Sequence, residues 1–237
     1  MSSLYLRDRP SPNHDARPGA VDMLVLHYTG MESAEAALDR LCSPEAKVSA
    51  HYLIDEDGTV WRLVPEERRA WHAGVSCWRR RRDINGASIG IELVNPGHGP
   101  DYRPFPEPQM AALETLAHDI IARHPIPPRH VLGHSDVAPQ RKADPGELFD
   151  WQRLARAGIG LWPDFTTLPP AGPAIAELQR QLAEIGYDAP QSGAEDAVTT
   201  AVITAFQRHF RPALCDGKAD TETRRRIAAV AAALRTS

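Results

Sequence analysis

Short apolar runs alternate with helical periodicities over the first two thirds of the chain. Met23–Tyr28 (MLVLHY) is a continuous apolar run of strand length, which predicts a sheet strand covered on both faces. Ser88–Val94 (SIGIELV) has the same character and stops at a turn sequence, Asn-Pro-Gly. Gly58 lies in a turn between two further apolar segments, a hairpin pattern. These and one later segment predict short strands at His51–Ile54, Thr59–Val64 and His130–Gly133.

Helical spacing of apolar residues appears in five segments. A stripe facing a core predicts a long helix over Glu107–His124, and a shorter one is predicted over Ser33–Cys42. Beyond a proline-rich stretch, helices are predicted at Ile175–Ile185, Ala197–Phe210 and Thr221–Leu234. The pattern therefore predicts a domain over 1–165, a stiff linker over 166–174, and a helical domain over 175–237. About sixty residues make a small core, which favours a docked or tethered module over a second enzyme domain.

Composition narrows the class of protein. The chain has 237 residues, of which 42% are hydrophobic and 24% charged, as in packed globular proteins and unlike disordered ones. Its net charge of −4 gives no basic field for nucleic acid, and no apolar run has the length of a membrane span. The three cysteines form no CxxC pair, which argues against a disulfide framework or an all-cysteine metal site.

Histidines at strand ends indicate a metal site. His27 ends an otherwise apolar strand, His134 follows a predicted strand, and Asp144 comes ten residues later in a loop containing Pro-Gly. Ligands at the ends of neighbouring strands are held rigidly, and two histidines with one carboxylate leave a tetrahedral position open for water. This is the donor set of a catalytic zinc. For the remaining histidines in loops or on helices, solvated surface positions are predicted: His14, His98, His118, His124 and His209.

Two further charged residues are candidates for chemistry. Glu92 lies within a predicted strand, between Ile91 and Leu93. It either points to a solvated face or lies in a cleft as a general base whose pKa is raised by burial. Lys142 is either an ordinary loop lysine or a cation aimed at the oxyanion of a tetrahedral intermediate.

Five collinear blocks carry a family resemblance over about 20–165: LVLHYTG, SAHYLIDEDGTVWRLV, RAWHAGVS, ASIGIELVN and GHSDVAPQRKADPGELFDW. They resemble the type 2 N-acetylmuramoyl-L-alanine amidases, a zinc family. The resemblance implies an α+β fold with a mixed central β-sheet flanked by helices and a metal at one sheet edge. Residues 174–235 resemble the three-helix peptidoglycan-binding domain, whose apolar positions here are expected to form its core.

The resemblance implies a role for each candidate residue. His27, His134 and Asp144 match the Zn²⁺ ligands, Glu92 the catalytic glutamate, and Lys142 the lysine near the scissile carbonyl. Asp144 stands where phage-type members carry cysteine, which places the chain in the AmpD/AmiD-like branch. The implied reaction is hydrolysis of the amide between (anhydro-)N-acetylmuramic acid and L-alanine of stem peptides, with muropeptides as partners. Four groove residues are left open between substrate contact and packing: Tyr28, Trp71, His72 and Asn85.

Other activities and another cellular location are alternatives to this interpretation. A recognition protein would bind muropeptide without cleavage, and a zinc peptidase would cut within the stem peptide. The first thirty residues carry charges and no apolar signal segment, so a cytoplasmic location and a role in cell-wall recycling are expected. A periplasmic enzyme that acts on intact wall is the alternative, which the helical domain favours.

Overall fold

The computed structural model describes residues 4–172 and 174–236; the remaining residues of the predicted domain ranges (1–3, 173 and 237) lie outside it. A six-stranded sheet of order β1-β5-β4-β7-β3-β8 forms the centre, and a small sheet pairs β2 with β6. The strands of the central sheet are β1 (Leu6–Asp8), β3 (Met23–Tyr28), β4 (Tyr52–Ile54), β5 (Val60–Arg62), β7 (Ser88–Leu93) and β8 (Val131–Gly133). Those of the small sheet are β2 (His14–Ala16) and β6 (Arg68–Ala70).

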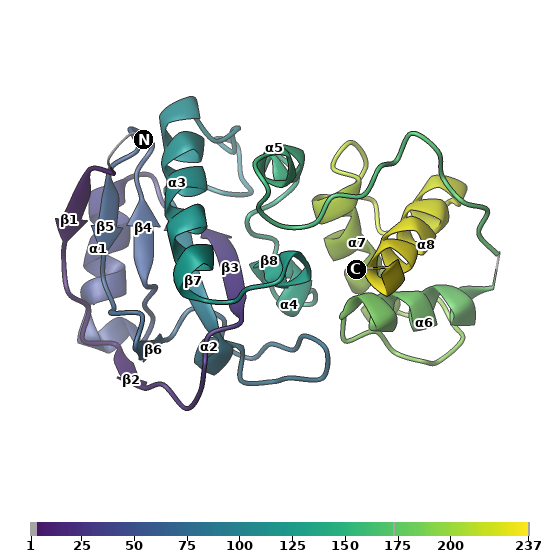
Figure 1. Cartoon of the computed structure of the whole chain (residues 1–237), viewed down its shortest axis with the longest axis horizontal. Coiled ribbons are helices and arrows are strands. Elements are labelled where there is room, and N and C mark those ends of the chain that lie inside the picture. Colours follow the sequence, from purple (N-terminus) through teal and green to yellow (C-terminus); the bar gives the residue numbers. More distant parts are fainter. Residues whose placement is uncertain (1–3, 173, 237) are drawn as a thin grey trace.

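Within the described residues, eight α-helices surround and extend this sheet (Figure 1). They are α1 (Ala34–Cys42), α2 (Ile84–Ala87), α3 (Glu107–Arg123), α4 (His134–Val137), α5 (Trp151–Arg156), α6 (Ile175–Ile185), α7 (Ala197–Phe210) and α8 (Thr221–Thr236). Single 3-10 turns form at Pro44–Ala46 and Pro128–His130. Ser33 caps α1 by accepting a hydrogen bond from the Ala36 amide, which fixes the start of that helix.

The sheet is mixed, as predicted. β3 runs parallel to β7 and β8, β7 runs parallel to β4, and β4 pairs antiparallel with β5 in the expected hairpin. β3 lies between two strands and under helices on both sides, which explains its continuous apolar sequence. The three unpredicted strands β1, β2 and β6 have three residues each and no apolar run.

Different elements cover the two faces of the sheet. α3 packs across one face against Leu24, Leu26 and their neighbours. On the other face α1 covers Leu53 of β4, while α6–α8 cover Met23 and Val25 of β3 together with Leu132 of β8. Figure 1 shows α3 in front of the sheet, α1 behind it and the three C-terminal helices at one end. On this second face, the carboxyl ends of β3 and β7 therefore lie between α1 and the three C-terminal helices.

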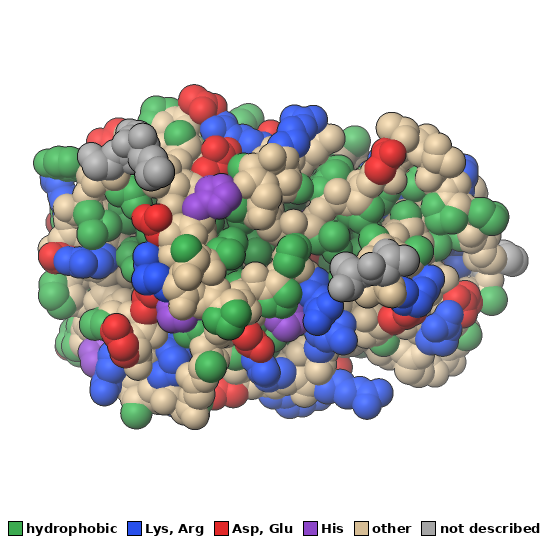
Figure 2. Space-filling model, viewed as in Figure 1, with side chains coloured by type: hydrophobic (Ala, Val, Ile, Leu, Met, Phe, Trp, Pro, Cys, Tyr) green, Lys and Arg blue, Asp and Glu red, His purple; other side chains and the backbone are tan. Residues whose placement is uncertain are grey.

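The three C-terminal helices and the loops between them (175–236), called the helical module below, form a core of their own. The predicted apolar positions are all buried in it: Leu178, Leu182, Ile185, Val202, Phe206 and Phe210. The same cluster continues into the sheet, so the module is docked and not merely tethered. In the space-filling view, apolar side chains extend across the junction (Figure 2). Among the described residues, no helix combines the length and apolar content needed to cross a bilayer.

Candidate metal centre

Strand register brings the candidate residues to one edge of the sheet. His27 and Glu92 are paired neighbours on the parallel strands β3 and β7, so their side chains leave the same face. β8, on the other side of β3, ends at Gly133, and His134 follows at once as the first residue of α4. Asp144 is drawn to the same place because its carbonyl accepts a hydrogen bond from the Ser135 amide at 2.9 Å. His134 and Asp144 thus meet beside His27, although they follow it in sequence by 107 and 117 positions.

Three ligand atoms converge at this edge. His27 Nδ1 lies 2.9 Å from His134 Nδ1 and 3.1 Å from Asp144 Oδ2, and His134 Nδ1 lies 3.0 Å from the same oxygen. All three residues are buried, and their ligand atoms form a group with the composition of a metal site. Tetrahedral zinc with bonds of ~2.0–2.1 Å spaces such atoms by about 3.3 Å. The triangle is close to that spacing.

Hydrogen bonds on the far side of each imidazole fix its tautomer. His134 Nε2 donates to the Ala73 carbonyl at 3.1 Å, so Nδ1 of the neutral ring carries no proton and presents a lone pair. Ser88 donates its hydroxyl proton to the Ile84 carbonyl at 2.6 Å, so its oxygen accepts from His72 Nε2 at 3.2 Å. His72 Nδ1 therefore accepts from His27 Nε2 at 3.0 Å. Neutral His27 must then also present the lone pair of Nδ1 to the centre.

The electrostatics of these atoms suit a bound cation. Burial, and next the neighbouring His134, lower the pKa of His27 to about 4, while burial lowers the pKa of His72 well below its usual value. Burial opposes ionisation of Asp144, but its interactions with the two neighbouring imidazoles, that of His134 first, outweigh this effect and lower the pKa of Asp144. Positive charge between them would stabilise two nitrogen lone pairs and a carboxylate that face one another. Two imidazoles and one carboxylate are a donor set that Zn²⁺ accepts, with a coordination position left open.

The centre opens into a cleft of about 300 Å³. Glu92, His134 and Asp144 line it with Lys142, whose side chain is exposed. Glu92 Oε2 is buried without a hydrogen-bond partner among the described residues. Burial, and next the charge of Asp144, raise the pKa of Glu92 well above its usual value, against the opposing effect of Lys142. A protonatable carboxyl thus stands beside the ligand triangle.

A family model described as "N-acetylmuramoyl-L-alanine amidase" matches residues 17–147, more than half of the chain. The chain belongs to the N-acetylmuramoyl-L-alanine amidase family. A second model, described as "Putative peptidoglycan binding domain", matches residues 171–227. The amidase match contains both candidate catalytic residues and all three candidate ligands. The family resemblance expected from the sequence is confirmed.

Individual amidases are similar over most of their length. N-acetylmuramoyl-L-alanine amidase AmiD of Escherichia coli is 42% identical over 223 residues, which are 86% of this chain and 79% of AmiD. AmpD of Enterobacter cloacae, a 1,6-anhydro-N-acetylmuramyl-L-alanine amidase, is 38% identical over 62% of this chain and 87% of its own length. The AmpD/AmiD-like branch is thereby confirmed.

Solved amidase structures share both the sheet and the helical module. AmiD from E. coli, in complex with the substrate anhydro-N-acetylmuramic acid-L-Ala-D-gamma-Glu-L-Lys, has a TM-score of 0.80, 40% identity and coverage of 91% of each chain. AmpDh3 from Pseudomonas aeruginosa has a TM-score of 0.82 and 36% identity over 96% of each chain. A second AmpDh3 structure holds anhydromuramic pentapeptide.

The amidase fold collects the predicted site residues, although their catalytic roles stay predictions. His27, His134 and Asp144 meet, and Glu92 and Lys142 line the same cleft. Glu92 thus lies at a cleft and not on an open solvated face.

The groove candidates separate into two groups. Tyr28, Trp71 and His72 line the cleft. Asn85 instead accepts hydrogen bonds from the amides of His72 and Ala73 at 3.1 and 2.8 Å, so it holds the loop that carries both. Its position just before a buried strand gave no indication of this backbone role.

One sequence prediction is wrong. His209 was expected on the solvated surface of the helical module, but its side chain is 4% exposed and lies in the junction with the amidase sheet. The reason is a buried hydrogen bond to Asp136 of α4. This partner belongs to the amidase domain, so the sequence of the module alone does not reveal it.

Proposed function

We propose that this chain is a zinc-dependent amidase that hydrolyses the amide between anhydro-N-acetylmuramic acid and L-alanine of a peptidoglycan stem peptide. The observation that carries this is the convergence of three buried acceptor atoms beside Glu92, whose Oε2 is buried without a partner among the described residues and which lines a cleft together with His134 and Asp144. Family membership and the anhydro-muropeptides present in two similar solved structures support this substrate class.

His27, His134 and Asp144 would hold Zn²⁺, which when bound lowers the pKa of a water and polarises the scissile carbonyl. Glu92 accepts a proton from the attacking water and passes it to the nitrogen of the leaving L-alanine. Its raised pKa suits this double role, because the carboxyl has to hold the proton between the two transfers. Lys142 directs its ammonium toward the oxygen of the scissile carbonyl, where negative charge develops. The balance is one water consumed, one C–N bond broken, and one acid and one amine released.

The direct test is incubation of the zinc-loaded chain with anhydro-N-acetylmuramic acid-L-Ala-D-γ-Glu-L-Lys, followed by mass spectrometry. The expected products are free anhydro-N-acetylmuramic acid and the intact tripeptide. Fragments cut within the peptide would identify a zinc peptidase instead. Saturable binding with no product would identify a recognition protein.

Substrate size is a second question, because the helical module matches a peptidoglycan-binding family. We propose soluble anhydro-muropeptides in cell-wall recycling as the main substrate, with intact wall as the alternative. Parallel assays on soluble muropeptide and on purified sacculi compare the two substrates. Cell fractionation tests the matching cytoplasmic location against a periplasmic one.

A further inference from the structure

The helix that carries His134 is too short to hold its own position. α4 is one turn, His134–Val137, and an isolated turn has no stability without outside contacts. Its anchor is Asp136, which is 1% exposed and accepts a hydrogen bond from the Gly133 amide at 2.8 Å. The other two hydrogen bonds that the structure gives the Asp136 carboxyl come from the helical module.

Two side chains of the module reach Asp136. Tyr187 donates its hydroxyl to Asp136 Oδ1 at 2.6 Å, and His209 Nδ1 donates to Asp136 Oδ2 at 2.7 Å. Both are buried, at 3% and 4% exposure. The His209 ring is also stacked between Trp151, at 3.8 Å between ring centroids, and Phe210, at 4.0 Å. Each donor is therefore held in place away from solvent. Removing one partner of such a buried hydrogen bond lowers the free energy of unfolding.

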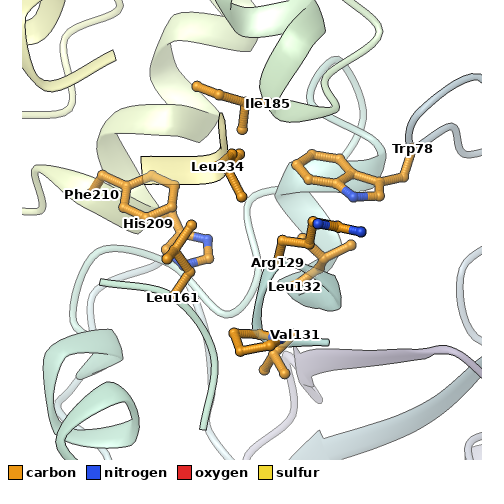
Figure 3. A pocket seen from close by; sticks show the side chains of 10 residues that line it. Trp78, Arg129, Val131, Leu132, Leu161, Ile185, His209, Phe210 and Leu234 are labelled. Atoms are coloured by element: carbon orange, nitrogen blue, oxygen red, sulfur yellow. The ribbon is translucent and has the colours of Figure 1, made fainter. Parts of the chain in front are cut away.

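The surface around this contact is closely packed. Figure 3 shows Ile185 and Leu234 of the module facing Trp78 and Leu132 of the amidase domain, and only about 10 Å³ of space remains there. At Gly186 a Cβ atom would lie 2.5 Å from Trp78 Cε2, so the two parts approach at van der Waals contact. Such packing holds the module in one position relative to β8 and α4.

The connection from Asp136 to the metal ligands is short. Asp136 lies two residues from His134, and the Ser135 amide between them donates to the Asp144 carbonyl at 2.9 Å. At the last residue of α4, the Cys77 amide donates to the Val137 carbonyl at 2.8 Å. Movement of α4 would therefore shift two of the three ligands together.

We infer that the helical module is a working part of the metal centre, and that Tyr187 and His209 are positioning residues that hold α4 so that His134 and Asp144 face His27. The inference rests on the proposed metal function of that site. It gives the module a role inside the enzyme that is independent of any polymer it binds. It also explains why two polar side chains of a small helical domain point into its junction.

The test compares conservative variants of the full chain. Tyr187→Phe removes one hydroxyl, and His209→Phe keeps a flat ring between Trp151 and Phe210 while removing the donor. Tyr52→Phe is the matched control, because Tyr52 also donates to a carboxylate, Glu66, at 2.7 Å, but lies away from the centre. Zinc dissociation constants are measured by competition with a chromogenic chelator, and global stability by urea unfolding.

We expect Tyr187→Phe and His209→Phe each to weaken zinc binding about tenfold, the lower end of the effect of outer partners of a metal site. Tyr52→Phe should change stability comparably and leave zinc binding unchanged. Zinc binding within twofold of wild type in both module variants would overturn the inference.

Hydrogen exchange of the metal-free proteins separates this inference from the proposed function. Tyr187→Phe should speed exchange of the Gly133 and Ala138 amides, which bond to Asp136 and His134. If wild type binds no zinc, the proposed function fails, and the exchange rates still decide whether the module holds α4. Unchanged exchange at both amides would overturn the inference even in a zinc-binding protein.

Discussion

Gly90 of β7 offers a sharp test of how His72 orients the first ligand. A Cβ atom at this position would lie 2.5 Å from Cγ, 2.6 Å from Cδ2 and 2.7 Å from Nδ1 of the His72 ring. Carbon atoms in contact normally stand about 3.5–4.0 Å apart. β7 is fixed between β3 and β4, so in Gly90→Ala the ring has to retreat by about 1 Å.

That displacement acts on a chain of hydrogen bonds. His72 accepts from His27 Nε2 at 3.0 Å and donates to the Ser88 hydroxyl at 3.2 Å, and a shift of this size breaks at least one of these bonds. Loss of such an outer partner typically weakens metal binding about 10–100-fold. Overpacking of a buried site adds a loss of about 1–3 kcal/mol in the free energy of unfolding.

The assay measures zinc dissociation constants by chelator competition and stability by urea unfolding. Gly19→Ala is the matched control, since a Cβ there meets nothing within 4 Å. The expected result is a tenfold or larger loss of zinc affinity in Gly90→Ala alone. A folded Gly90→Ala protein that binds zinc as tightly as wild type would refute the assignment of His72 as the residue that orients His27.

Three other outcomes are expected. Glu92→Gln should retain zinc and lower kcat about 10²–10⁴-fold, the usual contribution of a general acid–base group; near-normal turnover would remove Glu92 from the mechanism. Asp144→Ala should lose zinc under mild chelation, and unchanged metal content would show that the ligand is misassigned. Glu66 is desolvated, yet Arg123 and other partners lower its pKa to about 2, so its carboxylate stabilises the fold above pH 4.5 and loses this effect as pH falls toward 2. A pKa lowered from 4.5 to about 2 corresponds to about 3 kcal/mol, and solvent screening reduces the loss expected for Glu66→Gln at pH 7 to about 2 kcal/mol. Urea unfolding at falling pH should show the gap closing.

The two candidate histidine ligands could be predicted because each breaks a local pattern. His27 is the polar residue of an apolar strand, and His134 opens a polar loop directly after another strand. Parallel strands bring such ends together, so position within an element was enough. Glu92 was harder, since strand alternation allows a solvated or a buried side. Only the register that pairs it with His27, and the separate coverings by α1 and the helical module, show that this side is a cleft.

His209 shows where the sequence carried a signal that composition obscured. Counting from Val202 and Phe206, a residue at 209 falls on the buried stripe of α7, three positions after one core aromatic and one before another. A polar side chain on such a stripe needs a buried partner, and the module supplies none for Nδ1 among its described residues. The partner is Asp136, 73 residues earlier in the chain. A buried polar position without a partner in its own domain therefore indicates that the domain docks, and here it also indicates the element of the metal centre that the domain holds.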